Sequence, residues 1–414
     1  MTAGSFLYGI KSNDLDFIVL RSNSRECNES LVYDLAQKSD LFHVVRNIGD
    51  AKVPIIELGL KLNENTAHSN IDGADIQIYN SFPLVDHFRR RYDTNLFYSN
   101  HDFMKNLHQF YLDETKELFA LSGIFENYNI KKYVNYYKDF QVLISFVKYW
   151  AKSRCVYGKA FGYLGGISWT IMGVFFLRKS LKSRAHVLQV DNSAQRFSQL
   201  VKDFFKFFSE WSWLHPVSLI DVDFVSGEAK DYIHKTPVTI LQCTFPYQNT
   251  SKNVSAEYKC LIDNEIKRAA SILSSDSNDL YNLYESVCQT IELNDIKEQN
   301  HVSFKIEYNL EEDLNHLFTL IKAKSQKLVT NIQRTHTDGV CRVYPNLFRH
   351  IKQTDRNESK FDQAAYFLIS LFQKEDIDSV KKKKILNLSC DFVKDIKNLS
   401  HACDFMISLE TKLI

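Results

Sequence analysis

The sequence contains little proline and little glycine: 6 and 13 residues, respectively, among 414. Both residue types interrupt helices and strands, so their scarcity argues against a loop-rich chain and favours long elements joined by short loops. Phenylalanine (30) and tyrosine (21) are abundant, and 44% of all residues are hydrophobic. The chain therefore has enough apolar surface for two or three domains with cores of their own.

The sequence also lacks paired cysteine motifs. Its eight cysteines are scattered, with no C-x-x-C pair and no spacing typical of a Cys/His zinc finger. In a chain of this length they are typical of reduced, mostly buried thiols in an intracellular protein, and they argue against structural zinc. They are Cys27, Cys155, Cys243, Cys260, Cys288, Cys341, Cys390 and Cys403.

No targeting or membrane-spanning segment is recognisable. The N-terminus has no basic segment followed by an apolar core, so we expect no signal peptide. The longest apolar stretch, from Ile167 to Leu177, contains Ser168 and Thr170 and is too short to cross a bilayer. We therefore expect a soluble protein of the cytoplasm or nucleus that makes no membrane contact.

An excess of charge of one sign is absent as well. Fifty-one basic residues face 50 acidic ones, which leaves a formal net charge of +1. This balance excludes a global field for attracting nucleic acid, so any contact with a polyanion must use local basic patches.

The hydrophobic pattern predicts elements of both kinds in the first two thirds of the chain. Residues 1–95 mix strands and one helix: strands at Asp14–Leu20, Val53–Leu60 and Ala74–Tyr79, and a helix near Ser30–Ser39. From about residue 100 to 215 the spacing is helical: Val142–Trp150, Trp169–Leu177 and Phe204–Trp213, with a tight break at Gly162–Gly166.

The pattern changes again near residue 298, where alternation returns. We predict strands at Val302–Tyr308, Cys341–Tyr344, Ala364–Phe372 and Lys384–Leu388, and helices at Glu311–Leu328 and Cys390–Leu399. This order suggests a separate small α+β domain at the end of the chain.

The first strand carries a chemically informative pattern. Asp14 and Asp16 occupy positions i and i+2, which share one face of a strand. Two close carboxylates repel each other, and a divalent ion such as Mg²⁺ removes that repulsion while keeping substrate phosphates as ligands. Gly4 lets backbone N–H groups approach a triphosphate, and Ser5 offers a hydroxyl. A structural or calcium-binding strand is the alternative interpretation.

One block in the middle of the chain resembles a known family. The run Val147-Lys148-Tyr149-Trp150-Ala151-Lys152 leads to Tyr157, and Phe161-Gly162-Tyr163-Leu164-Gly165-Gly166-Ile167-Ser168-Trp169 follows. This block is similar to the central helical domain of eukaryotic nuclear-type poly(A) polymerases. Two later segments agree in order: the aromatic run 204–213 before Pro216-Val217, and Phe245-Pro246-Tyr247-Gln248-Asn249-Thr250.

The resemblance implies an α+β fold of three domains. These are a polymerase β-like nucleotidyltransferase domain with a mixed sheet over 1–95, a central helical domain over 96–297, and an RRM-like RNA-binding domain over 298–414. The family has a long helical stretch before its Gly-Ser turn. The chain here begins almost at that turn, as expected of a truncated gene model or a minimal variant.

The resemblance also implies a set of site residues. Asp75, on a strand after Val53-Pro54-Ile55-Ile56, would be the third carboxylate beside Asp14 and Asp16, and the three would bind two Mg²⁺ or Mn²⁺ ions. The residues that would contact ATP are Gly4, Ser5, Ser122, Lys148, Tyr157, Gly165, Gly166 and Ile167. Ser122 and Lys159 stand where the family has asparagines, so ATP selectivity is less firmly implied than the reaction type.

The function implied is template-independent addition of AMP from ATP to RNA 3′ ends, as in mRNA polyadenylation in the nucleus. The partners implied are the RNA 3′ end, ATP and 3′-end processing proteins. Two alternatives stay open. A terminal uridylyl or mixed-nucleotide transferase is one, because the run Asp75–Asn80 also resembles those enzymes. A non-catalytic RNA-binding relative is the other.

Overall fold

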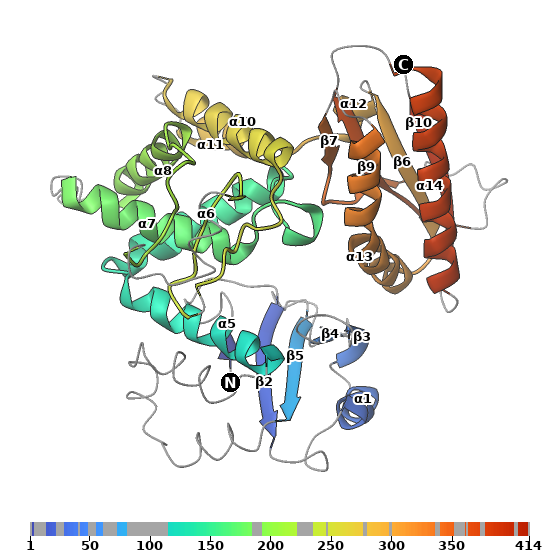
Figure 1. Cartoon of the computed structure of the whole chain (residues 1–414), viewed down its shortest axis with the longest axis horizontal. Helices are drawn as coiled ribbons and strands as arrows, with labels where there is room; N and C mark the ends of the chain where they lie inside the picture. Colours follow the sequence, from blue (N-terminus) through green and yellow to red (C-terminus); the bar gives the residue numbers. More distant parts are fainter. Residues whose placement is uncertain are drawn as a thin grey trace.

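The computed structural model describes most of the chain from residue 115 onward and the main elements before it. The described residues are 2–3, 14–21, 29–39, 42–48, 55–60, 73–80, 115–183, 193–221, 235–245, 247–275, 280–297, 300–335, 340–351, 361, 363–372, 377–400 and 405–412. Figure 1 shows a small sheet near the N-terminus, a group of helices above it, and a second sheet with its helices to the right.

The N-terminal sheet is mixed, as the sequence predicts. Its strands are β1 (Thr2–Ala3), β2 (Asp14–Arg21), β3 (Phe42–Ile48), β4 (Ile55–Leu60) and β5 (Gly73–Asn80), and helix α1 spans Glu29–Lys38. They are ordered β1-β2-β5-β4-β3, with β2 and β5 parallel and the other neighbours antiparallel.

The elements predicted in this region are largely confirmed. Residues Val32 and Ala36 of α1 are buried with Ile56 and Leu58 of β4, so the helix covers one part of the sheet. The strand β3 was not predicted. Val53 and Pro54, which the sequence assigned to the second strand, lie outside the described residues.

The central region is helical. Its helices are α5 (Thr115–Lys132), α6 (Tyr137–Ser153), α7 (Gly166–Ser183), α8 (Ser193–Ser209), α10 (Ala256–Leu273), α11 (Leu280–Cys288) and α12 (Leu293–Lys297). Trp150 of α6 and Trp169 of α7 are fully buried and meet edge to face, with ring centroids 5.8 Å apart. Both tryptophans therefore belong to the core of the central region.

The aromatic helix ends earlier than predicted. α8 stops at Ser209, whereas the predicted helix extends to Trp213. Trp211 and Trp213 follow the helix but still pack against the core, so the aromatic pattern continues past the last helical residue. Apolar periodicity alone could not locate that end.

The C-terminal region has the order β-α-β-β-β-α-β. Its elements are β6 (His301–Tyr308), α13 (Glu311–Thr335), β7 (Val340–Val343), β8 (Phe348–Ile351), β9 (Gln363–Phe372), α14 (Ser379–Leu399) and β10 (Phe405–Lys412). The antiparallel sheet is ordered β10-β6-β9-β7, and β8 also pairs with β9. The described parts of the chain thus form an α+β protein, as predicted.

One predicted strand in this region is wrong. Lys384–Leu388 lies inside α14, which begins where the Asp378 side chain accepts hydrogen bonds from the backbone N–H groups of Val380 and Lys381. The buried residues of α14 recur at helical spacing: Ile385, Ser389, Phe392 and Ile396. A short apolar run does not distinguish strand from helix, which is why the pattern misled.

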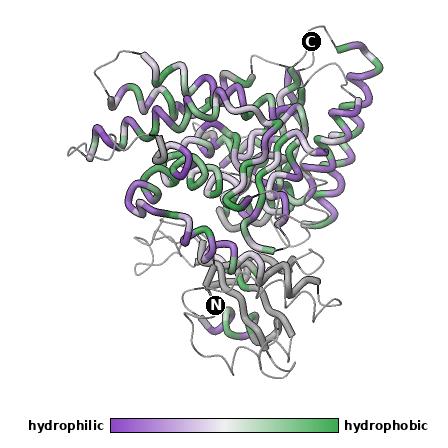
Figure 2. Tube along the Cα trace, turned by 60° about the vertical axis from the view of Figure 1, so that its left-hand side comes forward, coloured by the Kyte–Doolittle hydropathy of each residue, from purple (hydrophilic) through white to green (hydrophobic). Residues whose placement is uncertain are grey.

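Most helices that the structure describes carry both hydrophobic and hydrophilic residues, whereas residues 168–177 of α7 are all buried. Figure 2 shows hydrophilic and hydrophobic residues alternating along the described helices. Among the described helices, none is long and apolar enough to cross a membrane. The described cysteines are free thiols; Cys155, Cys243, Cys288 and Cys341 are buried, whereas Cys260 and Cys390 are exposed.

Candidate nucleotide and metal site

The predicted carboxylates lie on adjacent strands of the N-terminal sheet. The parallel register of β2 and β5 pairs Asp16 with Asp75, and Asp14 with Gly73. On the other side of β5, the antiparallel register pairs Asp75 with Glu57 of β4. Sequence reasoning missed Glu57, because nothing in a single strand shows which residue its neighbour places alongside it.

The metal site itself stays a prediction. Among the side chains that the structure describes, no group of three His, Cys, Asp or Glu residues is arranged to hold a metal ion. The side chains of Asp14, Asp16 and Asp75 are not among them, and Gly4 and Ser5 lie outside the described residues altogether.

Three of the predicted ATP contacts meet between α6 and α7. Gly166 is the first residue of α7, and a Cβ atom placed on it would lie only 2.6 Å from the Tyr157 hydroxyl oxygen. The same Cβ atom would lie 3.8 Å from Cε of Lys148. A lysine, a tyrosine and a helix start that excludes a side chain therefore lie together, and their contact with ATP, which the resemblance implies, stays a prediction.

The chain reaches this arrangement through a tight helix end. α6 closes with a Schellman motif, in which the Val156 N–H donates to Ala151 O at 2.8 Å and the Cys155 N–H donates to Lys152 O at 3.1 Å. Cys155 has a φ of 53°, a left-handed conformation that usually selects glycine. The strained turn directs the chain toward Tyr157.

A glycine-dependent loop then leads to α7. Gly158 has a φ of 123°, and its N–H donates to Leu164 O at 3.1 Å, which closes the loop beside Tyr157. Gly165 has more room than Gly166, because a Cβ atom there would be 3.6 Å from Cβ of Lys159, an ordinary contact. Ile167 follows in the first turn of α7, partly buried against the core.

Ser122 lies on a different helix, α5. It is 1% exposed, and its hydroxyl has no hydrogen-bond partner among the described residues. A buried hydroxyl without a partner is uncommon, and it remains able to bind a ligand or a water molecule.

The segment 245–251 proves to be structural. The Asn249 side chain accepts hydrogen bonds from the N–H groups of Ile240 and Ser251 and donates to Val238 O, so it orders its own loop. Ser168, next to Ile167, donates to the Thr250 hydroxyl at 2.9 Å. This loop therefore supports the start of α7.

A buried carboxylate that the sequence did not reveal anchors the same loop. Glu126 of α5 is fully buried and accepts hydrogen bonds from the backbone N–H groups of Cys243 (2.9 Å) and Thr244 (2.8 Å). Burial raises its pKa to about 7, although those N–H groups act in the opposite direction. A single glutamate in a helix carries no sequence signal of such a role.

Comparison with known proteins identifies the central region. Residues 139–286 match the poly(A) polymerase central domain family. This part of the chain is similar to poly(A) polymerases. Lys148, Tyr157, Gly165, Gly166 and Ile167 all lie inside this poly(A) polymerase central domain.

Individual proteins similar to this chain are named poly(A) polymerases. Poly(A) polymerase PAPalpha of Candida albicans is 25% identical over 288 residues, which cover 66% of this chain and 45% of that protein. Nuclear poly(A) polymerase 4 of Arabidopsis thaliana is 31% identical over 145 residues, 33% of this chain and 18% of that protein. The chain therefore spans less than half the length of these poly(A) polymerases.

A solved structure of a cytoplasmic RNA terminal U-transferase has a TM-score of 0.44 and 17% identity, covering 71% of this chain and 86% of that chain. A TM-score below 0.5 gives no basis for assigning a nucleotide or an activity.

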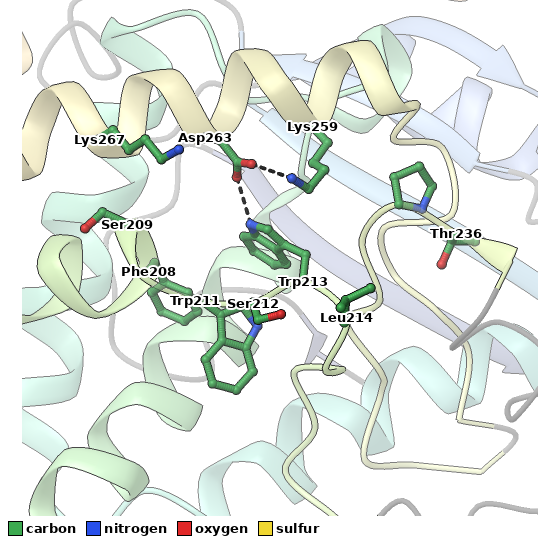
Figure 3. Close-up of a pocket in the computed structure, with 11 residues that line it drawn as sticks. Phe208, Ser209, Trp211, Ser212, Trp213, Leu214, Thr236, Lys259, Asp263 and Lys267 are labelled. Atoms are coloured by element: carbon green, nitrogen blue, oxygen red, sulfur yellow. Dashed lines mark hydrogen bonds and ion pairs between the residues drawn. The ribbon is translucent and has the colours of Figure 1, made fainter.

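The poly(A) polymerase central domain also borders a cavity away from the predicted site. It has a volume of about 790 Å³ and is lined by the end of α8, the following turn and α10, with no predicted site residue among its lining (Figure 3). Asp263 accepts hydrogen bonds there from Trp213 Nε1 at 2.7 Å and Lys259 Nζ at 2.6 Å. The bond from Trp213 ties the turn after α8 to α10, whereas Lys259 and Asp263 are both residues of α10.

Proposed function

We propose that this protein is a template-independent poly(A) polymerase that adds AMP from ATP to RNA 3′ ends. The observation that carries the proposal is the meeting of Lys148, Tyr157 and Gly166 within a poly(A) polymerase central domain. These residues come from a helix, a loop and a helix start, and they bring a cation, a hydroxylated ring and a residue without a side chain to one place.

Each of the three has a role suited to a nucleoside triphosphate. The Lys148 ammonium group neutralises phosphate charge, and Tyr157 contacts the nucleotide through its ring or hydroxyl. Gly166 has no side chain, which lets the Tyr157 hydroxyl lie close to the first turn of α7, whose N–H groups favour negative charge. Positioning and charge neutralisation account for most of the catalysis in phosphate transfer.

Asp14, Asp16 and Asp75 are the residues proposed to hold two Mg²⁺ or Mn²⁺ ions. Carboxylate oxygens are hard ligands of the kind that these ions prefer, and the register of Asp16 beside Asp75 supports a shared site. Two such ions, when bound, stabilise the attacking and leaving oxygens of an in-line displacement. The protein's own contribution is to hold three carboxylates on two adjacent strands.

The remaining parts of the proposal concern domains, partners and location. The three regions 1–95, 96–297 and 298–414 are proposed as catalytic, central and RRM-like RNA-binding domains. The four-stranded antiparallel path β10-β6-β9-β7 and the two helices of the last region support this. A nuclear location and recruitment by 3′-end processing proteins follow from the name of the Arabidopsis relative and from the resemblance.

Extension of a labelled oligo(A) primer tests the proposal. Wild-type protein is incubated with Mg²⁺ or Mn²⁺ and each of ATP, UTP, CTP and GTP separately, beside an Asp14→Ala/Asp16→Ala variant. Long tails from ATP alone, absent in the variant, are the expected result. No extension by correctly folded wild-type protein would contradict the proposal and favour a non-catalytic RNA-binding relative.

The same assay addresses nucleotide choice. Ser122 presents a hydroxyl where the family has an amide, and loss of such a partner costs about 1–3 kcal/mol in a buried site. We expect ATP to remain the best substrate. Equal or better use of UTP would keep the chemistry and move the protein to the terminal uridylyl or mixed-nucleotide class.

A further inference from the structure

The C-terminal region reaches across to the end of helix α6. Arg342 of β7 donates from Nη2 to Arg154 O at 3.0 Å, and Asn346 donates from Nδ2 to Lys152 O at 3.3 Å. The last carbonyl groups of a helix have no partner within that helix. Two side chains of the C-terminal domain therefore cap the helix that carries Lys148.

A buried charge cluster fixes the same contact. The Glu265 carboxylate of α10 binds Arg154 Nε at 2.9 Å and Arg342 Nη2 at 3.1 Å. Burial alone would raise the pKa of Glu265, but the hydrogen bond from Arg154 and the charge of Arg342 outweigh it and lower the pKa. The carboxylate stays ionised and holds both arginines in place.

The C-terminal domain also holds the chain beyond Tyr157, at Phe161 and Tyr163. Tyr163, 1% exposed, donates its hydroxyl hydrogen bond to Val343 O at 2.9 Å. Phe161 packs between Phe318 of α13 and Phe367 of β9, with ring centroids 6.5 and 6.2 Å away. The segment from Arg154 to Tyr163 is therefore attached to the C-terminal domain at both ends.

Tyr157 lies in the middle of this segment, where its backbone pairs with Leu164. The C-terminal domain holds both ends of the segment from Arg154 to Tyr163. A shift of either end would therefore move Tyr157 relative to Gly166 and Lys148. We propose that Arg342 and Asn346 are positioning residues for the nucleotide site, so that the C-terminal domain sets the affinity for ATP through the end of α6. This inference rests on the proposed function and deepens it.

The test compares three variants with wild-type protein: Arg342→Gln, Asn346→Ala and, as control, Arg349→Gln, an exposed arginine on β8 of the same domain. Mg²⁺-ATP binding is titrated directly, and KM for ATP, KM for primer and kcat are measured by extension. Hydrogen exchange of residues 152–166 reports the order of the segment. Asn346 is exposed, so its variant should fold even if Arg342→Gln does not.

We expect Arg342→Gln to weaken ATP binding and raise KM for ATP about tenfold, the effect of losing one buried hydrogen-bond partner. Asn346→Ala should act in the same direction with a smaller change. Exchange over 152–166 should accelerate in both, whereas kcat and KM for primer should stay within about twofold of wild type, and Arg349→Gln should match wild type throughout.

Unchanged ATP affinity in a folded Asn346→Ala or Arg342→Gln protein would overturn the inference, as would an equal loss of ATP and primer affinity. Failure of the proposed function looks different. Wild-type protein would then bind Mg²⁺-ATP without extending RNA, and the binding and exchange measurements would still decide the positioning role. Wild-type protein that binds no nucleotide would overturn both.

Discussion

The central helices meet their neighbours at two junctions, each built around a buried glutamate, and the two glutamates behave in opposite ways. At the C-terminal junction, Glu265 faces two arginines, and its pKa is lowered although burial opposes this. At the other junction, Glu126 joins α5 to the loop before α10 through hydrogen bonds from neutral backbone and side-chain groups of Cys243 and Thr244, and burial raises its pKa to about 7.

The difference shows what a buried carboxylate needs in order to remain charged. Hydrogen bonds from neutral N–H groups offset part of the cost of removing a carboxylate from water, whereas full positive charges offset more of it. The Glu265 junction should therefore keep its structure over the whole physiological pH range. The Glu126 junction should respond to pH near neutrality.

Removal of the charge at Glu265 should have the largest effect on stability. Glu265→Gln leaves Arg154 and Arg342 buried without a counter-charge, and breaking a buried pair in this way costs about 3–5 kcal/mol. Urea denaturation would measure it, with the exposed Glu210→Gln as control. A loss below about 1 kcal/mol would contradict the view that this cluster joins the two domains.

The pH dependence of stability should come from Glu126. Its folded pKa of about 7 lies above the ordinary value of 4.5, so the folded state holds a proton that the unfolded state releases. The contribution of Glu126 to stability is therefore greatest below pH 4.5 and decreases by roughly 3 kcal/mol as pH rises to 7. Denaturation at pH 5 and pH 7.5 should show this decrease in wild type and its absence in Glu126→Gln. An unchanged slope in the variant would refute the assignment.

A substitution at the contact between α6 and α7 should have an intermediate effect on stability. A Cβ atom on Gly173 of α7 would lie 2.0 Å from Cδ1 of Ile144 on α6, so Gly173→Ala overpacks the helix pair and should destabilise by about 1–3 kcal/mol. Gly123→Ala in α5 meets nothing within 4 Å and should stabilise by up to about 1 kcal/mol. Ile144→Val should partly rescue Gly173→Ala, and failure to do so would exclude the close contact as the cause.

The smallest effect on stability should come from Gly166→Ala. The new methyl group would crowd Tyr157, so ATP affinity should decrease about tenfold while the melting temperature changes little. The measurements are an ATP titration and a thermal melt beside Gly123→Ala. Equal ATP affinity in both variants would remove Gly166 from the site.

The resemblance assigned to one proposed site three residues that lie close together along the chain, and the structure brings these three together. Lys148, Tyr157 and Gly166 fall within twenty residues of one another, so a motif could include all three. The two junctions depend on partners far apart in sequence: Glu126 binds residues 117 and 118 positions away, and Glu265 binds Arg154 111 positions away. A single sequence gives no sign of such pairs.

The same limit applies to the N-terminal sheet. The spacing of Asp14 and Asp16 alone indicated the D-x-D strand. Its place beside Asp75 was implied only by the resemblance, and the pairing of Asp75 with Glu57 was not predicted. Register between strands depends on loops and packing that local alternation does not encode.

Photo-crosslinking with 8-azido-ATP in the presence of Mg²⁺, followed by peptide mapping, tests the central claim most directly. The account predicts labelling within residues 148–167 that unlabelled ATP suppresses and that Gly166→Ala weakens. Labelling in the cavity between Trp213 and Lys267 instead, or labelling that ATP does not suppress, would contradict the placement of the nucleotide beside Lys148, Tyr157 and Gly166.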